Sequence, residues 1–301
     1  MRVGDIPAFL QGHTHQKISV GKSGADVYAV GHDMLLKHAR REALSCAGIW
    51  DSYVTEARMY DWFREKRVSW VPELLYERRT PHEVVLLLRR YRMLEHEEAV
   101  PRLAGIMQIL AQIHALPVPD FLDAPKRFYT ALPPERLQEC LEGWKSVLAE
   151  HGGRFNTGDA AFVAKHFDMV NECFHPQTCM LTHGDFHCDN LLLNERGELL
   201  VCDWQSVNIG TPAGDIAFFL SRLSADGASL NADALIESYC AAAEAVGVSA
   251  DPETIRCDMT LSSLNAAFLF WHRYLHDNPP ERVGGILHKM TADTNWLLSK
   301  V

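Results

Sequence analysis

Several features are missing from this sequence of 301 residues, and each absence argues against a class of protein. No run of about 18 apolar residues occurs, so no transmembrane helix is predicted. The first residues lack the basic and then apolar segments of a secretory signal peptide, and the eight cysteines include no CxxC pair. We therefore expect a cytoplasmic protein with reduced thiols, without a disulfide framework and without a membrane partner.

Positive charge is scarce in the second part of the chain. Residues 1–90 carry 14 Lys and Arg against 11 Asp and Glu, whereas residues 91–301 carry 15 against 28. Binding to nucleic acid needs a basic surface, so this balance argues against a nucleic-acid partner. A phosphate-rich ligand would favour the first part and a cationic partner the second, although the acidic excess is equally consistent with solubility alone.

The spacing of apolar residues divides the chain into a sheet-rich part and a helical part. Residues 1–90 contain short alternating segments separated by turns, and residues 52–66 have helical spacing. From residue 91 onward helical spacing dominates, interrupted by a predicted hairpin with the strands "LLL" and "LLVCDW". We predict an α+β fold, with a lobe of antiparallel sheet and one helix at residues 1–90 and a larger helical lobe at residues 91–301.

The segment "LTHGDFHCDN" allows two interpretations. In an extended segment alternate residues share one face, and here these are His183, Asp185, His187 and Asp189. Such a set would suit zinc or another divalent transition metal, as in a metal-dependent hydrolase. Gly184 inside the supposed strand weakens this interpretation, and no HExxH pattern occurs elsewhere. In a loop, His187 and Asp189 would instead face solvent or touch a substrate.

The other interpretation is the catalytic loop of a phosphoryl-transfer enzyme, written H-x-D-x4-N. His183, Asp185 and Asn190 have this spacing, and Asp203 follows on the far side of the predicted hairpin. Phosphoryl transfer needs a carboxylate to accept the proton of the acceptor hydroxyl, and hard oxygen ligands for Mg²⁺. Asp185 is therefore the candidate base, with Asn190 and Asp203 as candidate Mg²⁺ ligands. We expect His183 and Asp215 to brace the loop.

Residues suited to the phosphates of a nucleotide occur earlier in the chain. The turn "GKSG" contains Gly21, Ser23 and Gly24 between two predicted strands, where the backbone can approach phosphates. Lys37 ends the next strand, and Glu56 lies on the following predicted helix, where it can pair with Lys37. Each signal alone is weak. Their order, followed by HxDx4N and a further Asp, is that of a nucleotide-dependent phosphotransferase.

With these motifs the chain resembles the aminoglycoside phosphotransferase and choline kinase-related family, small-molecule kinases with a protein-kinase-like two-lobe fold. The resemblance is most specific in "LTHGDFHCDN", in the Asp-Trp dipeptide and in "GTPAGDIA". It implies ATP or GTP as phosphoryl donor, Mg²⁺ as cofactor, and Lys37 paired with Glu56 at the phosphates. It also implies that adenine lies against the backbone around Leu88 and Tyr91. Gln205 stands where the family often has an acidic residue.

The acceptor is expected to be a small molecule, because only eleven residues separate Asp203 from Asp215. That interval is too short for the activation loop of a protein kinase. The acidic second part favours an aminoglycoside-type antibiotic or another amine-bearing alcohol, which Trp271, Tyr274 and Asp277 are candidates to contact. Packing is the alternative role for the two aromatic residues. A pseudokinase-like module that binds nucleotide without transferring phosphate is the alternative function.

Overall fold

The computed structural model describes residues 5–18, 24–44, 47–123, 131–174, 179–225 and 230–301. The helices in these ranges are α1 (Ile6–Gln11), α2 (Ala47–Lys66), α3 (His96–Ala99), α4 (Leu103–His114), α5 (Pro134–Ala149), α6 (Thr157–Phe174), α7 (Pro212–Ala225), α8 (Ala232–Ala245), α9 (Pro252–Phe270) and α10 (Pro280–Leu298). The strands are β1 (His15–Ile18), β2 (Asp26–Val30), β3 (Met34–Arg40), β4 (Leu74–Arg79), β5 (Glu83–Arg89), β6 (Arg92–Met93), β7 (Met180–Thr182), β8 (Leu191–Leu193), β9 (Leu199–Val201) and β10 (Asn208–Gly210).

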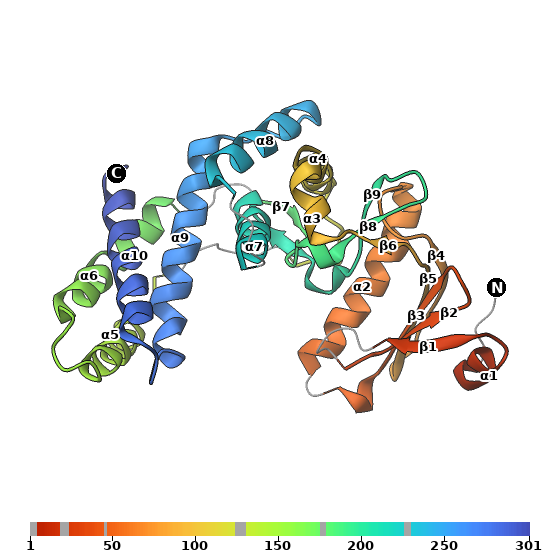
Figure 1. Cartoon of the computed structure of the whole chain (residues 1–301), viewed down its shortest axis with the longest axis horizontal. Coiled ribbons are helices and arrows are strands. Elements are labelled where there is room, and N and C mark those ends of the chain that lie inside the picture. The colour runs from red at the N-terminus through yellow and green to blue at the C-terminus, as the bar shows by residue number, and fades with distance from the viewer. Residues whose placement is uncertain (1–4, 19–23, 45–46, 124–130, 175–178, 226–229) are drawn as a thin grey trace.

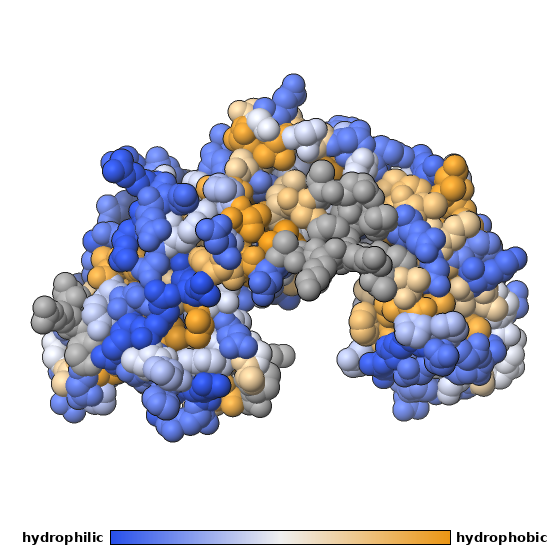
Figure 2. All heavy atoms as spheres, turned by 180° about the vertical axis from the view of Figure 1, so that it is seen from behind, coloured by the Kyte–Doolittle hydropathy of each residue, from blue (hydrophilic) through white to orange (hydrophobic). Residues whose placement is uncertain are grey.

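The elements form an arch. The sheet of β1 to β5 lies with α1 and α2 at one end, and the helices α5, α6, α9 and α10 lie together at the other (Figure 1). Between them lie α3, α4, α7 and the strands β6 to β9 (Figure 1). Figure 2 shows the surface hollowed between the two ends. The middle part therefore joins a sheet-rich end to a helical end, as the apolar spacing predicts.

The N-terminal sheet is antiparallel, with the strand order β1-β2-β3-β5-β4. Its strand β5 is buried on both faces because alternate residues enter two different cores. Val84, Leu86 and Leu88 belong to the core that includes α2, whereas Val85 and Leu87 pack in a smaller core with α1. The sheet is thus covered on both faces, and β3, which carries Lys37, lies between β2 and β5.

Helix α2 begins at Ala47, five residues before the predicted start, and runs for 20 residues. Tyr53, Ala57, Tyr60 and Phe63 form its buried face at helical spacing. Glu56 lies on the same face and is 1% exposed, so a carboxylate points from the helix into the protein interior. A buried carboxylate requires a partner of opposite charge.

The middle part contains short strands that the apolar spacing does not reveal. β7 pairs with β10, and β6 pairs with β8, and each of these strands has two or three residues. The predicted hairpin is present as β8 and β9, but its second strand ends at Val201 instead of continuing through Trp204. Asp203 has a φ of 63°, so it turns out of the strand direction in the left-handed region that Asp tolerates.

Two separate hydrophobic cores stabilise the C-terminal part. The larger core joins α4, β7 and α7 to α2 and β5 of the N-terminal part. The other core lies among α5, α6, α9 and α10. The backbone N–H of Val201 also donates to the carbonyl oxygen of Trp70, at 2.9 Å. The sheet ends at Arg89, but packing continues across this point, and the division after residue 90 remains a prediction.

None of the helices in the described ranges combines the length and the apolar character needed to cross a membrane.

Candidate active site

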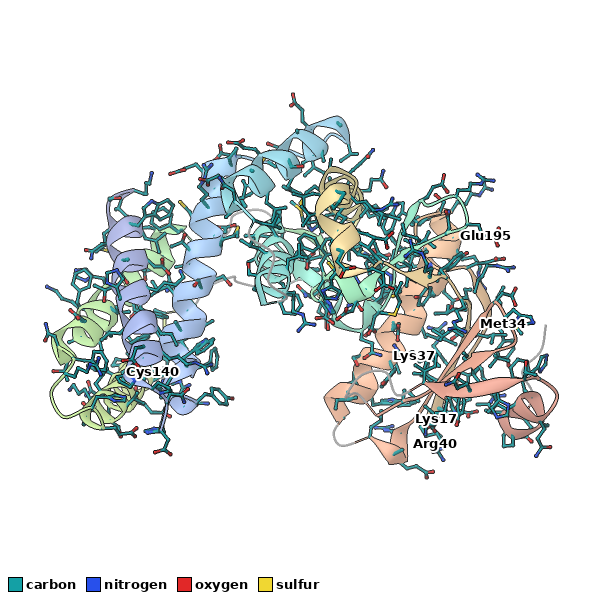
Figure 3. All side chains as sticks on the ribbon, viewed as in Figure 1. Lys17, Met34, Lys37, Arg40, Cys140 and Glu195 are labelled. Atoms are coloured by element: carbon teal, nitrogen blue, oxygen red, sulfur yellow. The ribbon has the colours of Figure 1, made fainter. Side chains whose placement is uncertain are left out.

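Lys37 and Glu56, paired in the sequence prediction, form an ion pair. The Nζ atom of Lys37 lies 2.7 Å from Oε2 of Glu56 and 3.1 Å from Oδ1 of Asp203. Figure 3 shows Lys37 on the sheet, on the side that faces α2. The ring of Tyr53 lies beneath the ammonium group, with Nζ 5.3 Å from its centroid. Lys37 therefore connects the sheet to α2 and to Asp203, which follows the hairpin of β8 and β9.

Burial and charge act against each other in this group. Burial by itself lowers the pKa of Lys37, but the carboxylates of Glu56 and Asp203 outweigh it, so the pKa lies above its usual value. Burial raises the pKa of Glu56, and the charge of Lys37 opposes this shift. Lys37 is therefore a fixed cation at neutral pH. Asp203 is 41% exposed at its side chain, so one face of the pair is open to a ligand.

The loop that carries Asp185 is ordered by Asn190. The Nδ2 atom of Asn190 donates to the backbone oxygen of Asp185 at 2.8 Å and to its Oδ2 at 3.3 Å. His187 Nε2 lies 3.6 Å from Asp185 Oδ2, and this imidazole is the main cause that holds the pKa of Asp185 below its ordinary value. Asp185 is therefore ionised at neutral pH, and its side chain remains 36% exposed.

Asp215 supports the same loop from α7, as expected from the sequence. Its carboxylate accepts hydrogen bonds from the backbone N–H groups of His183 and Gly184, both at 2.8 Å. His114 Nε2 donates to it as well, at 3.2 Å. Burial raises the pKa of Asp215, but these partners more than compensate, and the net shift is downward. Asp215 is 1% exposed, so a buried anion holds the start of the loop in place.

His183 is a buried brace. Its Nε2 donates to the backbone oxygen of Cys202 at 3.0 Å, and its Nδ1 accepts from the N–H of Asp185 at 3.3 Å. Burial lowers the pKa of His183, which agrees with a neutral ring having one donor and one acceptor nitrogen. Its ring also packs against Trp204, at 4.7 Å between centroids. His183 therefore couples the position of the Asp185 loop to that of the segment before Asp203.

The alternating residues do not converge as a metal cluster. His183 points into the core, whereas Asp189 contacts His96 at 2.9 Å and Arg222 at 3.1 Å. In the described residues, no group of three or more His, Cys, Asp or Glu side chains is placed to hold a metal ion. His187 lies between Asp185 and Asp189 with only 13% of its side chain exposed, so it does not simply face solvent, and its contact with a substrate stays a prediction.

A comparison with protein families identifies the family of this chain. The model of the phosphotransferase enzyme family matches residues 15–253. The chain belongs to this family. No curated protein matches the sequence. The family assignment makes the protein a phosphotransferase, and the resemblance noted in its motifs is confirmed.

Solved structures of kinases share the fold of this phosphotransferase at low sequence identity. An ADP-bound aminoglycoside phosphotransferase has a TM-score of 0.57 at 13% identity, covering 96% of this chain and 98% of its own. Choline kinase from Cryptosporidium parvum has a TM-score of 0.56 at 12% identity, covering 96% and 90%. Macrolide 2'-phosphotransferase from Brachybacterium faecium has a TM-score of 0.56 at 16% identity, covering 97% and 96%. The predicted kinase-like fold is confirmed, and the chain is a small-molecule kinase.

The oxygen atoms of this phosphotransferase suit Mg²⁺. Because Nδ2 of Asn190 donates to Asp185, its amide oxygen is left as an acceptor, and no residue in the described ranges donates to it. Asp203 offers its second carboxylate oxygen, since only Oδ1 contacts Lys37. One amide oxygen and one carboxylate are hard ligands of the kind that Mg²⁺ prefers, with phosphate oxygens and water completing its shell. The residues predicted as metal ligands therefore fit the ion chemically.

The structure describes only some of the remaining predicted nucleotide contacts. Gly21 and Ser23 lie outside the described residues. Gly24 has a φ of 88°, a conformation that favours glycine, in the turn before β2. Leu88 is 4% exposed and its side chain packs in the core, so only its backbone can contact a base. The side chain of Tyr91 lines a cavity at the end of α2.

Sequence reasoning missed some supporting contacts of this phosphotransferase. His114 accepts a hydrogen bond from the Tyr239 hydroxyl at 2.7 Å while it donates to Asp215. The hydroxyl of Tyr53 accepts from the N–H of Ala25 at 3.2 Å and so ties the turn before β2 to α2. These partners are 28 to 125 residues apart along the chain, and no local spacing marks them.

Gln205, the departure from the family pattern, contacts the ion pair. Its Nε2 donates to Oε2 of Glu56 at 3.3 Å. We expect Gln205→Glu to reduce the free energy of unfolding by about 1 kcal/mol at pH 8, because it replaces a donor with a second carboxylate beside a buried one. Urea unfolding would measure this. Gln205→Met, which removes the donor without adding charge, is the control and should cost less. An equal or smaller loss for Gln205→Glu would contradict the prediction.

Proposed function

We propose that this phosphotransferase moves the γ-phosphoryl group of ATP or GTP to a hydroxyl group of a small, amine-bearing acceptor. The observation that carries the proposal is the bridging position of Lys37 between Glu56 and Asp203. A fixed cation on the sheet, next to a half-exposed carboxylate on the other lobe, is suited to hold polyphosphate between them.

Asp185 is the proposed base. Its lowered pKa keeps it ionised, and Asn190 fixes both its backbone and its carboxylate. An ionised, oriented carboxylate can align the acceptor hydroxyl and take its proton as the new bond to phosphorus forms. The low pKa makes Asp185 a weak base, so its main contribution is to position and polarise the hydroxyl.

Lys37 is proposed to neutralise charge on the phosphates when nucleotide binds. Its ammonium group already has two carboxylate partners, and Glu56 holds it against the sheet from the opposite side. Asn190 and Asp203 would hold Mg²⁺, which supplies further neutralisation of the phosphate charge when it is bound. Asp215, His183 and Gln205 act indirectly, by keeping these side chains in position.

An amine-bearing alcohol is the proposed acceptor class. Residues 91–301 carry 15 Lys and Arg against 28 Asp and Glu, which suits a cation. Trp271 and Tyr274, expected either to pack or to contact the acceptor, are 38% and 76% exposed, so part of each ring is accessible to a ligand. Aromatic faces near acidic groups can bind an amphipathic cation. Solved structural neighbours are named for aminoglycosides, choline and macrolides, which supports the same class.

A panel of acceptors tests the proposed reaction. The purified full chain, with Mg²⁺ and either ATP or GTP, is assayed for nucleotide consumption in the presence of aminoglycosides, macrolides, choline-like amino alcohols and matched neutral polyols. We expect at least one amine-bearing compound to stimulate turnover, and the neutral polyols to have little effect. Tight nucleotide binding without stimulation by any compound would instead support a pseudokinase-like binding module.

A further inference from the structure

A cavity of about 440 Å³ lies at the C-terminal end of α2, away from the proposed catalytic residues. The end of the helix and the segment leading into β4 form most of its wall, and Tyr91 closes one side. Lys37, Asp185 and Asp203 do not line it. Its volume lies within the range of about 300–1,000 Å³ that is usual for small-molecule sites. The cavity is therefore large enough for a small-molecule ligand.

The wall combines an apolar interior with positive charge at the surface. Phe63, Val68 and Tyr91 are among the buried or half-buried side chains that line it. Two exposed arginines, Arg64 and Arg67, also line it. An apolar surface with a cationic edge is complementary to a molecule that has an apolar body and an anionic group.

Arg67 is the cation available to such a molecule, because Arg64 and Glu73 in the same wall are already in ion pairs. Arg64 is paired with Asp61 at 2.6 Å, and the acidic lining residue Glu73 is paired with Arg89 at 2.8 Å. Within the described ranges Arg67 has no ion-pair partner. Its guanidinium group can therefore form a charge-assisted, two-pronged hydrogen bond to a carboxylate without first breaking another pair.

The backbone at Arg67 supports the assignment independently. Arg67 directly follows α2 and has a φ of 56°, and the next N–H, from Val68, donates to the carbonyl oxygen of Phe63 at 3.0 Å. Helices that end this way usually have glycine at the left-handed position, where another residue costs about 1–2 kcal/mol. The chain thus places a long cationic side chain at the mouth of the cavity in a backbone conformation that disfavours it. Such strained positions concentrate at ligand sites.

Tyr60 connects the cavity to the catalytic ion pair. It lines the cavity and is 1% exposed, and its hydroxyl has no hydrogen-bond partner in the described part of the chain. Burial, followed by the charges of Glu56, Cys202 and Asp203, raises the pKa of that hydroxyl. Tyr60 therefore lies between the cavity and the carboxylates around Lys37, and an occupant would contact the helix that carries Glu56.

We propose that this cavity is a second binding site, which takes a small organic carboxylate with a ring system as its apolar body. The rings lie against Phe63, Val68 and Tyr91, and the carboxylate is bound by Arg67. The site contains none of the proposed catalytic residues, but the backbone of Tyr91, which lines it, is also a predicted adenine contact. Binding there does not require the proposed kinase reaction. Because it involves α2, an occupant stabilises the helix that holds the catalytic ion pair in place.

Calorimetric titration of the full chain with 2-naphthoate, and with the neutral isostere 2-naphthamide, tests the proposal. We expect saturable binding of one naphthoate per chain, about fivefold or more tighter than the amide, because a charge-assisted hydrogen bond to an exposed arginine contributes that much. Arg67→Gly should abolish this preference while leaving the thermal midpoint unchanged or higher, since glycine relieves the backbone strain.

Two further variants test whether naphthoate binds in this cavity. Arg196→Ala removes an exposed arginine from the turn between β8 and β9, outside the cavity, and should leave naphthoate affinity unchanged. Ser69→Trp fills the mouth of the cavity from an exposed lining position and should reduce binding of both compounds. The absence of saturable binding, equal affinities for acid and amide, or equal losses in the Arg67 and Arg196 variants would overturn the proposal. None of these measurements requires kinase activity, so they are independent of the acceptor panel.

Discussion

Asp185→Asn is expected to lower kcat by about a thousandfold, because it removes the carboxylate that positions the acceptor hydroxyl and takes its proton. The substitution removes the negative charge while preserving the size of the side chain. The hydrogen bond from Asn190 to the backbone oxygen of Asp185 does not depend on the carboxylate, so the loop should keep its conformation. Steady-state kinetics with a stimulating acceptor would measure the loss, and the KM for nucleotide should change little.

Asp189→Asn is the matched control for this prediction. It makes the same chemical change in the same loop, but the carboxylate of Asp189 contacts His96, Arg222 and His187 instead of an open surface beside Asn190. We expect a loss in kcat of less than tenfold. If both substitutions reduce kcat equally, loop structure and not proton transfer accounts for the effect. Normal kcat in Asp185→Asn would contradict the assignment of the base.

Gly184→Ala is expected to have the largest effect on folding among single substitutions in the site. A Cβ atom at Gly184 would lie 2.1 Å from the backbone oxygen of Ser206, and the φ of 78° is already unfavourable for alanine. The clash involves backbone, which cannot rotate away. Conformational strain and overpacking together should reduce the free energy of unfolding by about 3 kcal/mol. Denaturant unfolding monitored by circular dichroism would measure this loss.

Gly197→Ala separates the conformational strain from the steric clash. Gly197 has a φ of 76°, nearly that of Gly184, but a Cβ there would have no neighbour within 4 Å. Alanine at this position should reduce the free energy of unfolding by only about 1 kcal/mol, the cost of the backbone conformation alone. Similar losses for the two variants would show that the contact between the catalytic loop and the segment after Asp203 is looser than the structure indicates. The glycine between His183 and Asp185 is thus required by that close contact.

Much of the site could be predicted because its residues follow each other in a fixed order. Short apolar segments mark β3 and β5, and helical spacing marks α2, so Lys37 and Glu56 could be assigned to elements that pack together. The HxDx4N spacing and the hairpin that follows it then identify Asp203 as the second candidate metal ligand. The structure joins these residues through one lysine, as the order suggested, with Asp203 as an additional partner of Lys37.

The rest could not be predicted, for physical reasons that the particular elements illustrate. Strands β7 and β10 have three residues each, too short for alternation to be distinguished from a loop. The contact of His114 with Asp215 joins residues 101 positions apart and depends on how α4 packs against the loop. The left-handed backbone of Arg67, which lines the cavity at the end of α2, is not suggested by a sequence that has no glycine at that position.

Analysis of the reaction product tests the central claim most directly. The full chain is incubated with Mg²⁺, ATP and the most stimulating amine-bearing acceptor, and the products are examined by mass spectrometry and phosphorus NMR. We predict one phosphate monoester on an acceptor hydroxyl for each ATP converted to ADP, and almost none with Asp185→Asn. Release of inorganic phosphate without a phosphorylated acceptor, or an equal yield of monoester from Asp185→Asn, would contradict the account.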